Sequence, residues 1–168
     1  MQLQPHPDTA VATAQEIDAS IWQDAGRWHF RFLVNGATDL ILPDAAEPGR
    51  ADDLWQTTCF EVFVGLAGSA YLEFNFSPSG QWAAYRFDAP RAGMREAIAE
   101  VEVWLEGGEG WIAVEAAVGG VSLAPGAALN LTAVIEEAGG AKSYWALAHA
   151  PGAPDFHDRA CFRGRLTE

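Results

Sequence analysis

Residues 71–88 read YLEFNFSPSGQWAAYRFD and decide the predicted fold. Apolar and polar residues alternate on both sides of the Ser-Pro-Ser-Gly sequence at 77–80, which is typical of two antiparallel strands joined by a turn. If residues 77–80 form the turn, Asn75 pairs with Trp82 across the hairpin. One face of the hairpin is then apolar. The other face carries a polar and aromatic set of side chains, namely Tyr71, Glu73, Asn75, Trp82 and Arg86.

The same alternation runs through the rest of the chain. It predicts the strand TCFEVFVG at 58–65 and strand pairs within 97–118 and 129–148, each pair divided by a glycine-containing turn. About ten or eleven strands, joined mainly by hairpins, favour an all-β antiparallel β-sandwich of the jelly-roll or immunoglobulin-like kind. A chain of 168 residues fits one ligand-binding domain over residues 1–168.

The composition is strongly acidic, with a formal net charge of −13 and a pI near 4.5. Such a chain repels phosphate backbones and anionic lipid surfaces, so neither nucleic acid nor a membrane is expected as a partner. No stretch resembles a signal peptide or a membrane span, which predicts a soluble, cytoplasmic protein. Cys59 and Cys161 fit no metal-binding or CxxC spacing and are expected to be reduced thiols.

Glu61 extends the polar face of the hairpin if its strand lies beside residues 71–76. Two carboxylates, an amide, a guanidinium and an indole on one surface suit a polyhydroxylated ligand, because the polar groups pair sugar hydroxyls and the indole covers the C–H side of a sugar ring. A solvated sheet face with weak surface ion pairs remains the alternative interpretation.

Four stretches also carry a family resemblance: LWQTTCFEVFVG at 54–65, the hairpin at 71–88, RAGM at 91–94 and ALAHAPGAPDFHDRACFRGRL at 146–166. Together they resemble the bacterial DOMON-like proteins, relatives of the family 9 carbohydrate-binding modules. The resemblance covers roughly residues 50–95 and 145–166. It implies a jelly-roll-like sandwich that binds sugar or haem on one sheet and performs no chemistry.

Sugar-binding members of that family hold a terminal sugar between two tryptophans, with a glutamate, an arginine and an amide bonding its hydroxyls. Trp55, six residues before Glu61, is similar to the first tryptophan, and Glu61 resembles the glutamate. Arg86 is the match to the arginine. Trp145 has the position of the second tryptophan in the sequence, whereas Trp82 lies nearer to Glu61 in the predicted hairpin.

Haem is the first alternative ligand, because haem-binding members place a methionine before a histidine as axial ligands. Met94 precedes His149 and His157 in that order. A second alternative is a protein-interaction module, which could form a homodimer through its edge strands. No cofactor follows from the residues themselves.

Two kinds of chemistry are disfavoured. A glycosidase needs two carboxyl groups about 5 to 9.5 Å apart, which Glu61 and Glu73 could supply, but Arg86 beside them would keep both ionised. Calcium needs six to eight oxygen ligands, and the loop PDFHD at 154–158 offers two carboxylates. We expect those aspartates to bond the local backbone instead.

The sequence therefore predicts a non-catalytic module that binds a sugar or a sugar-containing small molecule on one sheet face. The predicted ligand-binding residues are Trp55, Glu61, Glu73, Asn75, Trp82, Arg86 and Trp145.

Overall fold

Strands form nearly all the regular structure of the computed structural model, which describes residues 1–9 and 13–167. Within those residues the only helices are two short 3-10 turns, η1 (Leu54–Gln56) and η2 (Arg159–Cys161). The all-β prediction is therefore confirmed. The strands are β1 (Gln2–Pro5), β2 (Glu16–Asp24), β3 (Arg27–Asn35), β4 (Gly49–Arg50), β5 (Cys59–Gly65), β6 (Tyr71–Phe76), β7 (Gln81–Phe87), β8 (Arg95–Glu96), β9 (Glu100–Gly108), β10 (Trp111–Gly119), β11 (Ala128–Glu137), β12 (Ala141–Ala146) and β13 (Gly164–Arg165).

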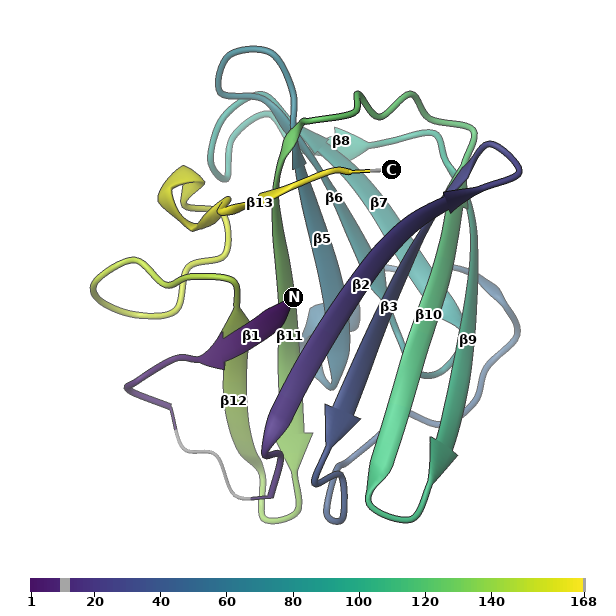
Figure 1. The fold of residues 1–168 in the computed structure, drawn as a ribbon, viewed down its shortest axis with the longest axis vertical. Helices are drawn as coiled ribbons and strands as arrows, with labels where there is room; N and C mark the ends of the chain where they lie inside the picture. Colours follow the sequence, from purple (N-terminus) through teal and green to yellow (C-terminus); the bar gives the residue numbers. More distant parts are fainter. Residues whose placement is uncertain (10–12, 168) are drawn as a thin grey trace.

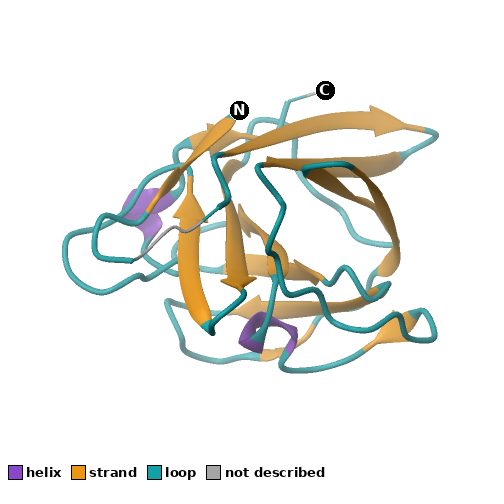
Figure 2. Ribbon diagram, turned by 90° about the horizontal axis from the view of Figure 1, so that it is seen from below, coloured by secondary structure: helices purple, strands orange, loops and turns teal. Residues whose placement is uncertain are grey.

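One continuous sheet runs through these strands in the order β4-β7-β6-β5-β11-β12-β1-β2-β3-β10-β9, with β13 beside β11 and β8 beside β7. The long strands β2, β3, β10 and β9 lie across from β5, β6 and β7 (Figure 1). Figure 2 shows the strands around a common interior, with both 3-10 turns at the periphery.

The prediction of two separate sheets needs correction, because β1 joins the two halves. Gln4 and Pro5 pair with β12, whereas Gln2 and Leu3 pair with β2. The short first strand thus serves as the corner of a barrel-like sheet. The alternating pattern correctly predicted strands, but it carries no information on whether two sheets share a strand.

The interior is filled by alternate side chains of both halves. Phe32 of β3 lies 5.2 Å from Phe60 of β5 between ring centroids, and Phe30 lies 6.2 Å from Phe76 of β6. Each buried ring of this size contributes about 1.5–3 kcal/mol relative to an exposed one. These contacts fix the inner face of β5 and β6, and therefore also fix which side chains point outward.

A second apolar cluster covers the outer face of the same strands. It is built around Phe63, Tyr71 and Phe87, over which Leu54 and Phe156 pack from two loops. Every residue of β6 is buried as a result. Cys59 and Cys161 are both buried and carry free thiols. In the part of the chain described, no helix is long and apolar enough to cross a membrane.

The predicted register of the β6–β7 hairpin is wrong by one residue. Phe76 pairs with Trp82, not with Gln81, and the offset continues along both strands. The loop has three residues, 78–80, because the backbone N–H of Ser77 donates to Gln81 O at 2.9 Å. Gly80 closes this loop at φ +90°, a conformation that favours glycine and is typical of a turn followed by a glycine bulge.

This shift reverses the face of every β7 side chain. Trp82 and Arg86 share the inner side with Phe76 and Leu72, and Trp82 packs against the interior core. Their predicted place beside Glu73 is therefore wrong. Trp145 is also on the interior side, where it is buried and donates from Nε1 to Ser143 Oγ at 2.9 Å, so its predicted place on the polar face is wrong too.

Candidate functional site

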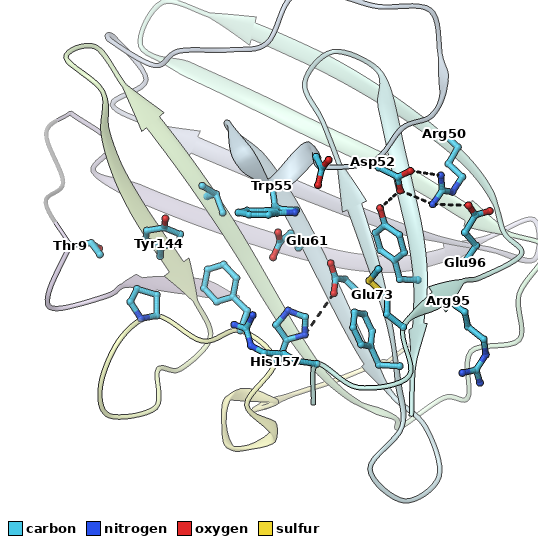
Figure 3. A pocket seen from close by; sticks show the side chains of 18 residues that line it. Thr9, Arg50, Asp52, Trp55, Glu61, Glu73, Arg95, Glu96, Tyr144 and His157 are labelled. Carbon is cyan, nitrogen blue, oxygen red and sulfur yellow. Dashed lines mark hydrogen bonds and ion pairs between the residues drawn. The ribbon is translucent and has the colours of Figure 1, made fainter. Parts of the chain in front are cut away.

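A cavity of about 990 Å³ lies over the outer face of β5, β6 and β11. Glu61 and Glu73 lie at its floor, and loop residues such as Asp52 and His157 form its walls (Figure 3). Arg91 also lines the cavity. Three loops that are far apart in the sequence, around 50–55, 88–96 and 154–157, therefore meet over one patch of sheet.

The floor is a network of polar side chains on neighbouring strands. Glu61 pairs directly with Asn75 on β6 and with Thr132 on β11. Thr132 Oγ1 donates to Glu61 Oε2 at 2.9 Å, and Asn75 Nδ2 donates to Glu73 Oε1 at 3.0 Å. The exposed fractions of Glu61 and Glu73 are only 4% and 6%. The predicted grouping of these two glutamates with Asn75 on one face is confirmed.

Two acceptor atoms in this network have no hydrogen-bond partner among the residues that the structure describes, namely Glu73 Oε2 and Asn75 Oδ1. Buried polar atoms in folded proteins are almost always paired, and an unpaired one costs about 1–3 kcal/mol. The exceptions here lie at the base of a cavity, where a bound molecule can pair them. Unpaired acceptors at such a place indicate a binding site.

Burial raises the pKa of Glu61 to about 8, with a further contribution from the charge of Glu73, while the hydrogen bond from Thr132 acts in the opposite direction. Burial likewise raises the pKa of Glu73 to about 7, against the lowering effects of Asn75 and Arg91. The two carboxyl groups therefore retain protons near neutral pH. Two like charges this close and this buried are costly to ionise together.

His157 closes one side of the floor through a chain of hydrogen bonds. The backbone N–H of Arg91 donates to Tyr71 Oη at 3.2 Å, and that hydroxyl lies 2.7 Å from His157 Nδ1. Burial, followed by the charge of Arg91, lowers the pKa of His157 to about 4, although Asp155 acts to raise it. The imidazole is thus neutral near pH 7. Because the Tyr71 oxygen already accepts from Arg91, we assign the Tyr71 proton to the bond with His157 Nδ1.

It follows that the 3.8 Å approach of His157 Nδ1 to Glu73 Oε2 is not a charge pair. The nitrogen already accepts from Tyr71, and a neutral ring whose Nδ1 is an acceptor carries its proton on Nε2. Glu73 Oε2 therefore gains neither a donor nor a countercharge from this histidine.

The arginines around the cavity are each paired with an acid. Arg50 contacts Asp52 at 2.8 Å, Arg91 contacts Asp155 at 2.9 Å, and Arg95 contacts Asp88 at 3.0 Å. A hydrogen bond from the Tyr85 hydroxyl to Asp52 links the rim to β7. These pairs fix the loops in place and leave little net positive charge at the opening.

Trp55 supplies the exposed aromatic surface of the site. It lies on η1, and its exposed fraction of 54% is large for an indole that lines a cavity. Asp53 begins the turn in the left-handed region at φ 61°, and Lys142 of β12 donates to Gln56 O at the other end. The turn is thus held over the sheet with one face of its tryptophan free.

Of the three residues considered as haem ligands, the structure brings two to the cavity. Met94 and His157 both line it, whereas His149 lies elsewhere, 2.8 Å from Gln4 O through Nε2 and packed against His6. Met94 is 63% exposed. Haem binding stays a prediction.

Several lining residues were missed by sequence reasoning. Tyr85 and Phe87 were placed inside by the one-residue register error, and the three-residue loop closed by Gly80 was the available signal. Arg50 ends the two-residue strand β4 and Asp52 follows it in a loop, and neither segment has a periodic pattern. In the PDFHD loop, Asp155 accepts from the His157 N–H and Asp158 from the Ala160 N–H, which confirms the predicted backbone-bonding role of these aspartates.

No protein-family model and no curated protein matches the chain. Among solved structures, the chain is similar to the crystal structure of a proposed carbohydrate-binding protein from Bacteroides uniformis ATCC 8492. The TM-score is 0.60 at 17% sequence identity, and the match covers 95% of this chain and 83% of the other. At this identity the likeness shows a shared all-β fold and leaves function to the residues of the site.

Proposed function

We propose that this protein is a non-catalytic module that binds a carbohydrate or a sugar-containing small molecule in the cavity over β5, β6 and β11. The observation that carries the proposal is the pair of unpaired buried acceptors, Glu73 Oε2 and Asn75 Oδ1, at the base of a cavity of about 990 Å³. Such a volume accommodates a small ligand such as a mono- or disaccharide. The similar fold of a proposed carbohydrate-binding protein supports the same choice.

The walls suit a sugar because they combine flat aromatic surface with fixed polar groups. The exposed indole of Trp55 can cover the C–H side of a sugar ring. Glu61 and Glu73 can hydrogen-bond hydroxyl groups, and where the carboxyl group is ionised such a bond is roughly twice as strong as a neutral one. The site thus offers one stacking surface and a floor that sets the orientation of the ring.

Isothermal titration calorimetry with a panel of mono- and disaccharides tests the proposal. We expect saturable heat for at least one sugar, and an affinity loss of about tenfold or more in Trp55→Ala because stacking and apolar contact are removed. Trp104→Ala is the matched control, since Trp104 is also exposed but lies on β9, outside the cavity. Folded protein that gives no heat with any sugar would falsify the proposal.

Glycoside hydrolysis is a second candidate, favoured by one observation. The sequence argument against it placed Arg86 beside both glutamates, but Arg86 lies on the inner face, and the pKa values of Glu61 and Glu73 are raised to about 8 and 7. A carboxylic acid that stays protonated near neutral pH is what a glycosidase requires. Release of nitrophenol from nitrophenyl glycosides, abolished in Glu61→Gln, would establish it in place of simple binding.

A further inference from the structure

The hydrogen-bonding pattern of the floor restricts the ligand more narrowly than sugar binding requires. Three hydroxyl groups lie beside the glutamates, and each donates its proton to another residue. Thr132 donates to Glu61, Tyr71 to His157 and Tyr85 to Asp52. Within the network of Glu61, Glu73 and Asn75, the buried atoms left unpaired are both oxygens, Glu73 Oε2 and Asn75 Oδ1. The Asn75 amide is held in this orientation because its nitrogen donates to Glu73.

The charge around the cavity points the same way. Five carboxylates line it, against three guanidinium groups. Each of those arginines is paired with an acid at the rim, and among the described residues no positive side chain is bonded to Glu61 or Glu73. Other ionisable groups near the pair are His157, Tyr71, Tyr85 and Cys59, and these are neutral near pH 7. The floor therefore has no bonded countercharge, and only the more distant charge of Arg91 acts on Glu73.

A neutral sugar hydroxyl both donates and accepts hydrogen bonds. At the unpaired oxygens of Glu73 and Asn75 its oxygen finds no donor. A primary ammonium group donates three hydrogen bonds, accepts none and carries the missing positive charge. It would pair the unpaired acceptors and offset the cost of ionising the two glutamates together.

We propose that the floor recognises a primary ammonium group, so that the preferred ligand is an amino sugar whose amine contacts Glu73 Oε2 and the neighbouring Glu61. This inference rests on the proposed function and names the substrate class of the same site. The sugar ring then lies toward Trp55. N-acetylation of the amine removes its charge and adds bulk, so an N-acetylated sugar should lose the preference.

The test compares glucosamine, galactosamine and mannosamine with their neutral parents and their N-acetyl forms, by calorimetry at about pH 7. We expect at least one amino sugar to bind wild-type protein about tenfold more tightly than its neutral parent. This gain in affinity is the one expected for a single charge-assisted hydrogen bond. Equal affinity for amino sugar and parent overturns the inference and leaves sugar binding standing. Absence of binding by the whole panel overturns both.

Two variants give an independent measure. Glu73→Gln should weaken binding of the amino sugar by about tenfold more than it weakens binding of the neutral parent, so that the preference for the amine is lost. Glu109→Gln, at the exposed β9–β10 turn and with the same change of charge, should leave the preference unaltered. A preference that survives Glu73→Gln, in a variant that is folded by circular dichroism, contradicts the assigned contact.

Proton release supplies a readout that a merely structural role for Glu73 would not change. An ammonium favours the ionised form of both carboxyl groups, so binding should expel protons that the pair holds near neutral pH. Calorimetry in two buffers of different ionisation enthalpy measures that number. We expect release with the amino sugar, little with its parent, and a smaller release in Glu73→Gln. Identical proton release with both ligands counts against the inference.

Discussion

Glu137 and Glu73 are both buried glutamates, yet their surroundings differ in kind. Glu137, the last residue of β11, has an Oε1 that accepts from the N–H and hydroxyl of Thr13 and from the Ala14 N–H, at 2.7, 2.8 and 2.9 Å. Glu73 has one acceptor bond from Asn75, and its second oxygen has none. The first carboxylate is satisfied by the fold itself, and the second is left for something the fold does not contain.

The comparison shows how burial should be interpreted in this protein. A buried charge with several donors stabilises the segment that supplies the donors, here the chain just before β2. A buried charge short of donors lowers the stability of the free protein, and natural proteins retain such sites mainly where they function. Three predictions test whether Glu137 and Glu73 belong to these two classes.

The largest expected effect is on stability. Removing the acceptor in Glu137→Ala leaves buried donors unpaired and should lower the free energy of unfolding by about 3–5 kcal/mol. Glu73→Ala should cost only about 1 kcal/mol, because water entering the cavity can pair Asn75. Urea denaturation followed by tryptophan fluorescence measures both values. Equal losses would remove the distinction between the two glutamates.

The next effect is a loss of stability in mild alkali. The pKa values of Glu61 and Glu73 rise from 4.5 to about 8 and about 7, so folding retains their protons, and the stability this gives at low pH is lost as pH rises through 7 and 8. His157 acts oppositely, but only as pH falls from 6.5 toward 4. Between about pH 6.5 and 8.5 we expect a fall of about 2 kcal/mol, measured by urea denaturation. A flat profile would show that the carboxyl groups titrate normally.

The smallest predicted effect is a change in the free energy of unfolding that has opposite signs in two matched variants. At about pH 8, Glu73→Gln should raise the free energy of unfolding by about 1 kcal/mol, because a neutral amide replaces a carboxylate that is costly to bury. Glu137→Gln should lower it by about 1 kcal/mol, because the same donors then meet an uncharged oxygen. Thermal and urea denaturation of the two matched variants decide the signs. The same sign for both would contradict the proposed contrast.

The sequence was informative where alternation and strand adjacency suffice. Glu61, Glu73 and Asn75 lie on two adjacent strands, and their parity places them on one face whatever the length of the next turn. Their role in binding stays a prediction. Trp82 and Arg86 depend on the turn as well, and one residue of loop length moved them to the interior.

The rest of the site could not be predicted because it is tertiary. The contacts of Tyr71 with His157 and of Tyr85 with Asp52 join β6 and β7 to distant loops, across 86 and 33 residues of sequence. The continuous sheet likewise depends on two short pairings of β1, which no period of hydrophobicity encodes. The face on which a strand residue lies follows from local alternation, whereas the place of a loop depends on tertiary packing.

The complete burial of β6 has a consequence for how binding preference could change. A strand that is buried on both faces cannot adjust its conformation to a ligand. The atoms that it presents are therefore already in place before binding, and little conformational entropy is lost when the ligand binds. Variation among ligands must then be accommodated by the loops at 50–55 and 88–96. Exchanging those loops while keeping β6 should change which ligand the site prefers without altering the sheet beneath it.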